Sequence, residues 1–195
     1  MSKLRKYGLD DLKENMQKLS SEEISEIVGG DTYVFNRYGR LIEHEVDDCP
    51  NDLVVVSHPS GSESVYWTKG KMSMKIEACE YEDTNTSEPR YGSRVEFRNA
   101  ELGLFKFFAD NTSVEWNAFY NGSRDASDDT NCMLRTIGDR YQVSGADVSD
   151  EYSNMIHNHP DKGRSPSDAD RENSSSYDNS GIYTTGRGIN WFKKS

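Results

Sequence analysis

The segment between His157 and Asp170 constrains this chain more than any other. It reads H-x-H-P, then six residues, then S-x-x-D. Alternate residues of a strand point to the same face, so a strand that runs through Met155 and ends at His159 presents both imidazoles side by side. Pro160 then stops the strand. The segment therefore predicts a strand end that carries two imidazoles, followed by a loop.

A helix start follows this loop. Ser165 is suited to cap a helix and Pro166 to occupy its first position, so we expect Asp170 in the first turns, facing back toward the histidines. Two imidazoles and one carboxylate suit Zn²⁺, although other divalent ions accept the same donors. Three protein ligands leave a position open for water, as catalytic zinc sites do. An isolated H-x-H is more often a turn pair without a metal, but the spaced serine and aspartate favour the metal site.

The same pattern resembles the JAMM motif of the JAB/MPN metalloprotease superfamily, whose members are metal-dependent peptidases and isopeptidases. Every fixed position of H-x-H-P-x6-S-x-x-D is present, with Asn158 where serine or threonine is more usual. The resemblance implies that His157, His159 and Asp170 bind zinc. It also implies that Ser167 stabilises the oxyanion.

That superfamily uses an upstream glutamate as general base, in a pattern that resembles E-x-x-G-x-x-x-G and follows a helix. Glu115 fits this pattern, with Ala118 in place of the first glycine, and Glu101 and Glu96 are the alternatives. In the chemistry that the resemblance implies, zinc lowers the pKa of its bound water. Glu115 accepts a proton from that water and passes it to the leaving amine, and Ser167 donates a hydrogen bond to the oxyanion.

The composition is polar for a folded domain. The 195 residues are 33% hydrophobic with a mean hydropathy of −0.89, but 11 Tyr, 7 Phe and 3 Trp supply bulk for a core. The net charge is −11 and the basic residues do not cluster, which argues against a nucleic-acid partner. No apolar run is long enough to span a bilayer, and the N-terminus lacks the apolar region of a secretory signal.

The three cysteines do not indicate a site of their own. They lie far apart without a C-x-x-C pair, so we expect neither a cysteine zinc site nor a disulfide framework. Cys132 lies near the glutamate pattern, but no histidine and aspartate are placed around it to activate a nucleophile.

Residues 1–30 differ from the rest of the chain. Their apolar residues recur at helical spacing and the segment ends at Gly29-Gly30, which stops a helix. One interpretation is an amphipathic helix packed on the domain. However, the stretch from Leu19 to Gly30 resembles the double-glycine leader of bacteriocin-type peptides, L-S-x-E-E-L-x-x-I-x-G-G. That resemblance implies export by a peptidase-containing ABC transporter with cleavage after Gly30, and the glycine pair suits a narrow protease cleft.

The remaining sequence predicts an α/β fold: a mixed JAB/MPN-like sheet flanked by helices over 93–195, preceded by a β-hairpin-rich extension over 31–92 and a helical leader over 1–30. In the extension we expect a polar loop from Glu80 to Gly92. The expected strands are 32–35, 41–46, 53–56, 64–67, 72–76, 94–97, 113–120, 133–137, 141–143, 155–159, 182–185 and 189–192, with a helix at about 100–109.

These expectations lead to one main functional prediction. The chain is expected to be a secreted zinc-dependent peptidase or isopeptidase, made in the bacterial cytoplasm and acting on a protein or peptide as a toxin or effector. A toxin of this kind requires an immunity protein in the producing cell. Two alternatives remain: a bacteriocin-like secreted binding protein with a vestigial metal site, and a cytoplasmic JAMM peptidase whose N-terminal helix is structural.

Overall fold

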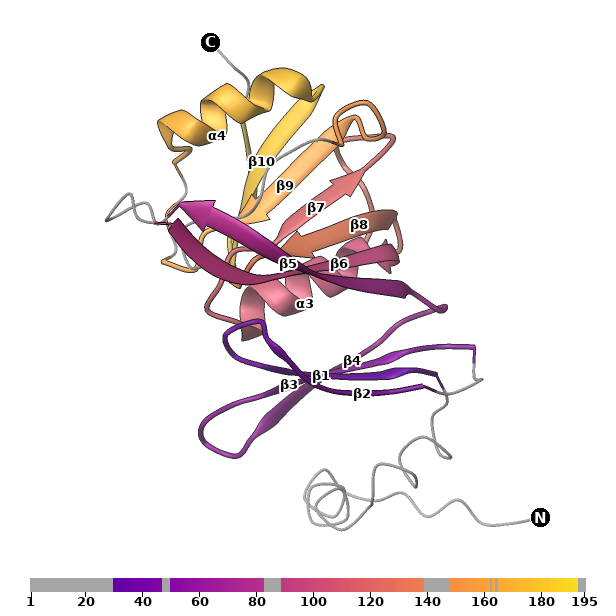
Figure 1. Ribbon diagram of the computed structural model, residues 1–195. Coiled ribbons are helices and arrows are strands. Elements are labelled where there is room, and N and C mark those ends of the chain that lie inside the picture. The colour runs from indigo at the N-terminus through magenta and orange to yellow at the C-terminus, as the bar shows by residue number, and fades with distance from the viewer. Residues whose placement is uncertain are drawn as a thin grey trace, which may run out of the picture.

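The computed structural model describes residues 30–46, 50–82, 89–138, 148–161, 163 and 165–192. Within this part of the chain, eleven strands form two sheets, accompanied by two short α-helices and one 3-10 turn, so the fold is mostly β. The larger sheet has seven strands in the order β11-β10-β9-β7-β8-β6-β5 (Figure 1). Its strands are β5 (Ser73–Glu82), β6 (Pro89–Glu101), β7 (Asn117–Tyr120), β8 (Asn131–Thr136), β9 (Asn154–Asn158), β10 (Asn179–Thr184) and β11 (Gly188–Phe192).

One parallel pair makes the larger sheet mixed. β9 and β10 run parallel, while the other neighbours are antiparallel. Parallel strands need a crossover connection, which usually carries a helix. Here the crossover carries α4 (Asp168–Asn173) and the 3-10 turn Ser174–Ser176. The loop and helix expected after Pro160 are therefore the connection that this parallel pairing requires.

The helices lie on opposite faces of the larger sheet. Ile156 packs into the core that contains α3 (Leu102–Asn111), whereas its neighbour Met155 packs with Tyr177 at the end of the crossover. Adjacent strand residues point to opposite faces, so α3 and α4 cover different sides of β9. Figure 1 shows the same arrangement, with α4 beside β10 and α3 beneath the sheet.

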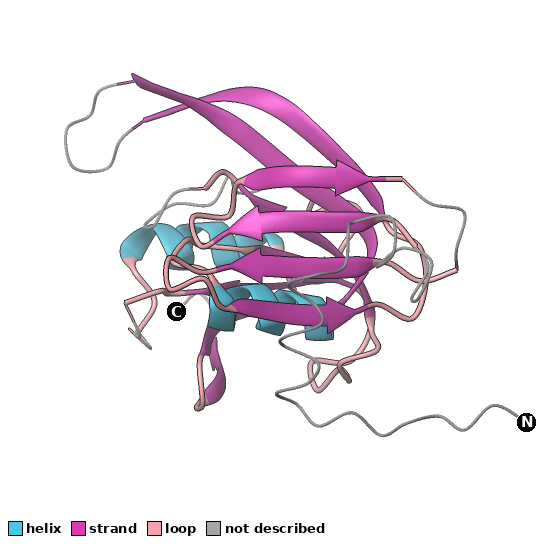
Figure 2. Ribbon diagram, turned by 90° about the horizontal axis from the view of Figure 1, so that it is seen from below, coloured by secondary structure: helices cyan, strands magenta, loops and turns pink. Residues whose placement is uncertain are grey.

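The smaller sheet packs on the α3 side. It has four strands, β1 (Thr32–Asn36), β2 (Leu41–Glu45), β3 (Leu53–Ser57) and β4 (Glu63–Trp67), in the order β2-β1-β3-β4. Two antiparallel hairpins, β1–β2 and β3–β4, join through parallel pairing of β1 with β3. Figure 2, viewed from below, shows this arrangement from a second direction.

A single aromatic cluster connects the two sheets through α3. The ring of Phe35 on β1 lies 5.9 Å from Phe97 on β6, 5.1 Å from Phe108 on α3 and 6.2 Å from Trp116, measured between centroids. Phe108 stacks on Trp116 with centroids 4.0 Å apart. These packed rings bury large apolar areas in favourable geometries. Because Trp116 follows Glu115 directly, the cluster also fixes the main chain beside the predicted base.

The expected polar loop from Glu80 to Gly92 is wrong. β5 continues to Glu82 and β6 already begins at Pro89, so residues 80–82 and 89–92 are in strands. Residues 83–88 lie outside the described part of the chain. Residues 75–78 are exposed, and in this part of the hairpin they pair with residues 93–96 of β6 through the main chain. β6 also crosses the expected division between 92 and 93, so residues 73–82 and 89–92 belong to the larger sheet.

One expected strand is shorter in the structure, and two other expected segments lie outside the described residues. The strand expected at 113–120 is shorter, since β7 begins at Asn117 and Glu115 precedes it. The strand expected at 141–143, and the leader as far as residue 29, lie outside the described residues. Among the described helices, none has the length and apolar character needed to cross a membrane.

Candidate metal centre

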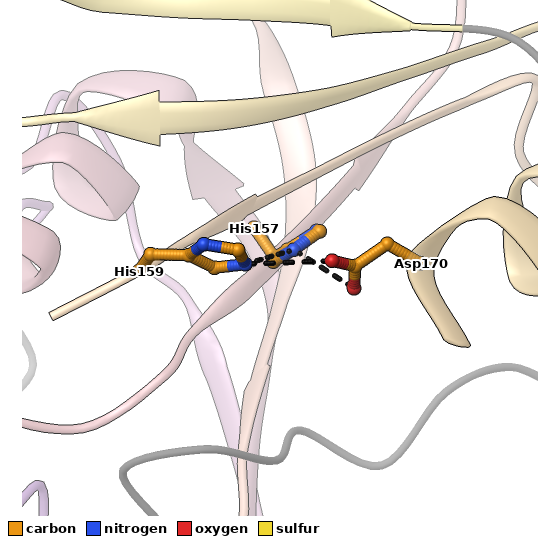
Figure 3. Close-up of side chains that lie close together, drawn as sticks. All are labelled: His157, His159 and Asp170. Carbon is orange, nitrogen blue, oxygen red and sulfur yellow. Dashed lines mark hydrogen bonds and ion pairs between the residues drawn. The ribbon is translucent and has the colours of Figure 1, made fainter. Parts of the chain in front are cut away.

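The end of β9 holds both histidines. His157 lies within the strand and His159 follows it. The side chain of His157 is 3% exposed and that of His159 is 19% exposed. Their Nε2 atoms lie 3.0 Å apart, with the ring planes at 49° (Figure 3). The two imidazoles therefore converge on one point, buried on one side and open on the other.

Asp170 approaches the same point from α4. Its Oδ1 lies 3.2 Å from Nε2 of His157 and its Oδ2 lies 3.5 Å from Nε2 of His159 (Figure 3). Among the described residues, these three form the group of His, Cys, Asp and Glu whose donor atoms all lie within 4.8 Å of one another. The structure thus brings together the three predicted metal ligands from two different elements.

The helix that carries Asp170 begins later than expected. The sequence predicts Ser165 as its cap, but the structure places the cap at Ser167, and the helix starts at Asp168. Ser167 Oγ accepts the Asp170 N–H at 3.1 Å, and Asp170 Oδ2 accepts the Ser167 N–H at 2.7 Å. This reciprocal capping box satisfies two helix-end donors, which Ser165 does not provide. It also fixes the Asp170 carboxylate at the start of the helix.

The electrostatics favour an ionised Asp170. Burial by itself raises the pKa of this carboxyl group, but hydrogen bonds with His157 and His159, and from the Ser167 amide, lower the pKa well below its ordinary value. A carboxylate that stays ionised is a ready ligand for a cation. The charge of Asp170 is therefore available at neutral pH.

The donor set fits zinc. Two nitrogens bound tetrahedrally at a normal zinc–nitrogen distance lie about 3.3 Å apart, close to the 3.0 Å between the two Nε2 atoms. The third donor is a carboxylate oxygen on the open side of the pair. Two imidazoles and one carboxylate form a three-ligand set that leaves a coordination position for water.

Glu115 lies on the neighbouring stretch of chain. β7 pairs antiparallel with β9, with Asn117 opposite His157. Glu115 lies two residues before Asn117 and outside β7, next to Trp116, whose carbonyl accepts the Asn158 N–H at 3.2 Å. Glu115 is 8% exposed and is not a member of the group formed by the two histidines and Asp170.

Ser167 lies beside the ligand group by virtue of the capping box. Its Oγ uses a lone pair to accept the Asp170 N–H, and its own O–H proton remains available for donation. The Ser167 residue is exposed. Its position at the start of α4 is therefore open to an approaching substrate.

Three polar residues around the site escaped the sequence analysis. Asn158 hydrogen-bonds the main chain on both sides of Glu115, and Thr136 Oγ1 donates to the Glu115 carbonyl at 2.6 Å. Asn117, which pairs with His157, is 1% exposed, and its Oδ1 accepts no hydrogen bond from the described residues. Of these three residues, only Asn158 was notable in the sequence, because serine or threonine is more usual at its position in the H-x-H-P motif.

The alternatives for the base lie elsewhere. Glu101 accepts hydrogen bonds from Tyr66 Oη at 3.0 Å and from the Lys69 amide, at the junction with the smaller sheet. Glu96 on β6 is three strands from β9, about 14 Å across the sheet, and pairs with Arg135 at 2.8 Å. Cys132 is buried and burial raises the pKa of its thiol, which disfavours a nucleophilic thiolate.

Comparison with protein families finds one family model that matches the part of the chain that contains this site. The sequence model of the family described as JAB-like toxin 1 matches residues 93–181, just under half of the chain. The match begins in β6, ends in β10 and includes the ligand group. This part of the chain is therefore similar to JAB-like toxin domains, which confirms the likeness to JAB proteins inferred from the motif. Neither the curated proteins nor the solved structures gave a match.

Proposed function

We propose that this chain is a secreted, zinc-dependent peptidase or isopeptidase that acts as a bacterial toxin. One observation carries the proposal: donor atoms of His157, His159 and Asp170 converge within 4.8 Å inside the part of the chain that matches the JAB-like toxin family model. A surface ion pair does not need two imidazoles from a strand end and a carboxylate from a capped helix. A three-ligand metal centre needs this arrangement.

His157, His159 and Asp170 would hold the metal. When bound, zinc supplies a water with a pKa near neutrality and polarises the substrate carbonyl. Glu115 accepts the proton of the attacking water and delivers it to the leaving nitrogen. Ser167 donates a hydrogen bond to the oxygen on which negative charge develops. The amide bond of the substrate breaks and a carboxylate and an amine leave.

The first test of the proposal measures zinc content and amide hydrolysis of the full chain. The substrates are a panel of peptides and isopeptide-linked conjugates. We expect His159→Ala to lose zinc and hydrolysis together. Glu115→Gln should keep zinc and lose about 10²–10⁴-fold in kcat, the range for general acid–base groups.

Matched controls lie in the smaller sheet. His58, whose Nε2 bonds Ser64 Oγ at 3.0 Å, and Glu63, which is exposed, are far along the chain from the ligand group. His58→Ala and Glu63→Gln should keep both zinc and activity. A wild-type chain that binds no zinc, or a Glu115→Gln variant as active as wild type, would contradict the proposal and favour a binding protein with a vestigial site.

Export is the second part of the proposal. The double-glycine pattern ending at Gly30 supports removal of residues 1–30 by a peptidase-containing ABC transporter. Co-expression with such a transporter should release a product that begins at Asp31, identified by mass spectrometry. Secreted material with an intact N-terminus would instead support a structural N-terminal segment. An immunity protein that neutralises the toxin in the producing cell belongs to the same proposal.

A further inference from the structure

Asn158, which lies between the two histidines, bonds the main chain on both sides of Glu115. Its Oδ1 accepts the Trp116 N–H at 2.7 Å, and its Nδ2 donates to the Val114 carbonyl at 3.1 Å. Asn158 is 2% exposed, so water competes little for either bond. A single side chain therefore links the strand that carries the histidines to both peptide groups that flank Glu115.

The side chain of Asn158 replaces a missing part of the strand ladder. The Asn158 N–H donates to the Trp116 carbonyl at 3.2 Å. In a regular antiparallel pair, the Trp116 N–H would donate in return to the Asn158 main-chain carbonyl. Here Oδ1 of Asn158 accepts that bond instead. The amide side chain thus extends the pairing beyond the start of β7 at Asn117, where the paired strands end.

The geometry separates this role from metal binding. Asn158 alternates with His157 and His159, so its side chain leaves β9 on the opposite face from the imidazoles. On the other side of the 114–116 segment, Thr136 Oγ1 donates to the Glu115 carbonyl at 2.6 Å. Three side-chain hydrogen bonds therefore hold the main chain around Glu115. All three bonds go to main-chain atoms of residues 114–116, so none of them uses the Glu115 carboxylate.

We propose that Asn158 is a positioning residue that sets where the Glu115 carboxylate lies relative to the His157–His159–Asp170 group. The inference rests on the proposed function, because it requires Glu115 to act as the base. Asparagine offers one acceptor and one donor group on a short, planar side chain, which both links require. Leucine has a similar size and offers neither. A displacement of about 1 Å in such a group costs up to about 100-fold in rate.

The test uses Asn158→Leu, with Asn154→Leu as the matched control. Asn154 is also a buried asparagine on β9, and it bonds the carbonyls of Tyr120 and Gly122 at the far end of β7. Both variants therefore remove buried amide hydrogen bonds between the same two stretches of chain. Only Asn158→Leu removes them beside Glu115. Each variant is made in the wild-type chain and in the Glu115→Gln chain.

The measurements are zinc affinity, kcat and KM, and the hydrogen-exchange rate of the Trp116 amide in the metal-free protein. For Asn158→Leu we expect faster Trp116 exchange and a kcat lower by about 10–100-fold. Zinc affinity and KM should stay within about twofold of wild type. In the Glu115→Gln chain the same change should lower kcat no further, because the residue through which it acts is already lost. Asn154→Leu should lower stability and leave kcat unchanged.

A milder variant tests the idea if Asn158→Leu does not fold. Thr136→Val keeps the shape of the side chain and removes the hydroxyl, which donates to the Glu115 carbonyl at 2.6 Å and accepts the Gly138 N–H at 3.0 Å. It should lower kcat by several-fold, again with no effect in the Glu115→Gln chain.

Several results would overturn the inference. Zinc loss in parallel with kcat would show that Asn158 supports the ligands instead. Equal kcat losses in the wild-type and Glu115→Gln chains, or the same loss from Asn154→Leu, would show a general structural role. An active wild type with a fully active Asn158→Leu refutes this inference alone. A wild type that binds zinc without hydrolysis refutes the proposed function, and the positioning role with it.

Discussion

Ser167 is the residue on which the helix and the proposed chemistry both depend. Its hydroxyl oxygen caps α4 through the Asp170 amide, and its main-chain N–H is bonded by the Asp170 carboxylate. The same hydroxyl proton is the proposed donor to the oxyanion. A residue with two such roles should show two separable losses when it is changed, one in stability and one in rate.

Replacing Ser167 should therefore affect both stability and activity. Ser167→Ala should cost about 0.5–2 kcal/mol of unfolding free energy through loss of the helix cap. It should also lower kcat by about 100-fold through loss of the oxyanion donor. Ser165→Ala is the control, since Ser165 is exposed and is not the cap. Urea unfolding and steady-state kinetics measure the two effects, and an equal loss of stability in both variants would contradict the assigned cap.

At the scale of elements, the site depends on the neighbouring strands of the larger sheet. Glu96 on β6 accepts hydrogen bonds from Arg135 on β8 at 2.8 and 3.3 Å, on the face that also carries His157. Burial raises the pKa of Glu96, but the hydrogen bonds from Arg135 and Arg98 outweigh it, so the pKa lies below its ordinary value. This pair therefore connects β6 and β8 most strongly when Glu96 is ionised.

The stability that Glu96 contributes should depend on pH. A carboxylate whose pKa falls on folding stabilises the folded state above its unfolded pKa of about 4.3, and this contribution is lost as pH falls through the folded-state pKa. Glu96→Gln should cost about 1–3 kcal/mol at pH 7, and the difference from wild type should shrink as the pH drops below about 4. Urea unfolding at several pH values measures this, with the exposed Glu43→Gln as control. A pH-independent difference would contradict the ion pair.

The sequence predicted the ligand set and the elements that carry it, because they depend on local patterns. The strand end at His159, the break at Pro160 and the helix containing Asp170 each have a signal within a few residues. The residue that caps the helix was harder to predict, because Ser165 and Ser167 are both suitable and each has an aspartate three residues later. In the structure, the hydrogen bond from the Ser167 N–H to the Asp170 carboxylate identifies Ser167 as the cap.

Other parts of the fold depend on partners far along the chain. The 80–92 segment is polar, so it shows no strand alternation, yet its residues outside 83–88 pair in β5 and β6. The bonds from Asn158 to Val114 and Trp116 span more than forty positions. No local pattern in the sequence indicates which residue an asparagine will meet at that distance. The order of strands in the larger sheet cannot be predicted from local sequence patterns for the same reason.

For the molecule as a whole, the aromatic cluster makes the two sheets depend on each other. Phe35 on β1 is fully buried against the rings of Phe97, Phe108 and Trp116. Removing the smaller sheet would therefore expose apolar residues of β6 and α3. The cooperative unit should include both sheets.

The described part of the chain should unfold in one transition. Phe35→Ala should cost about 3–5 kcal/mol by leaving a cavity between the sheets, and it should leave zinc affinity unchanged because the ligands lie on the other face. Ile42, which is 60% exposed, provides the control Ile42→Ala. Calorimetry and zinc titration check both points. Two separate transitions would show that the sheets fold independently.

On the export route that we propose, cleavage after Gly30 and folding should exclude each other. Gly30 has φ +107°, and a Cβ there would lie 1.1 Å from the Asn51 carbonyl oxygen, while the Asp31 N–H donates to Asp52 Oδ1 at 3.0 Å. The Gly30–Asp31 bond is therefore packed against the start of β3. We expect a double-glycine peptidase to cleave the urea-unfolded chain and to spare the folded chain, measured by mass spectrometry. Equal cleavage of both would contradict this order of events.

The two faces of the larger sheet are covered by different elements. The ligand group occupies the α4 face, and the smaller sheet packs on the α3 face, with exposed apolar side chains such as Ile42 and Trp67 on its surface. A substitution at such a position changes the surface of the smaller sheet without moving an atom of His157, His159 or Asp170. We therefore expect the outer surface of the smaller sheet to accept new side chains while the candidate metal centre keeps its geometry.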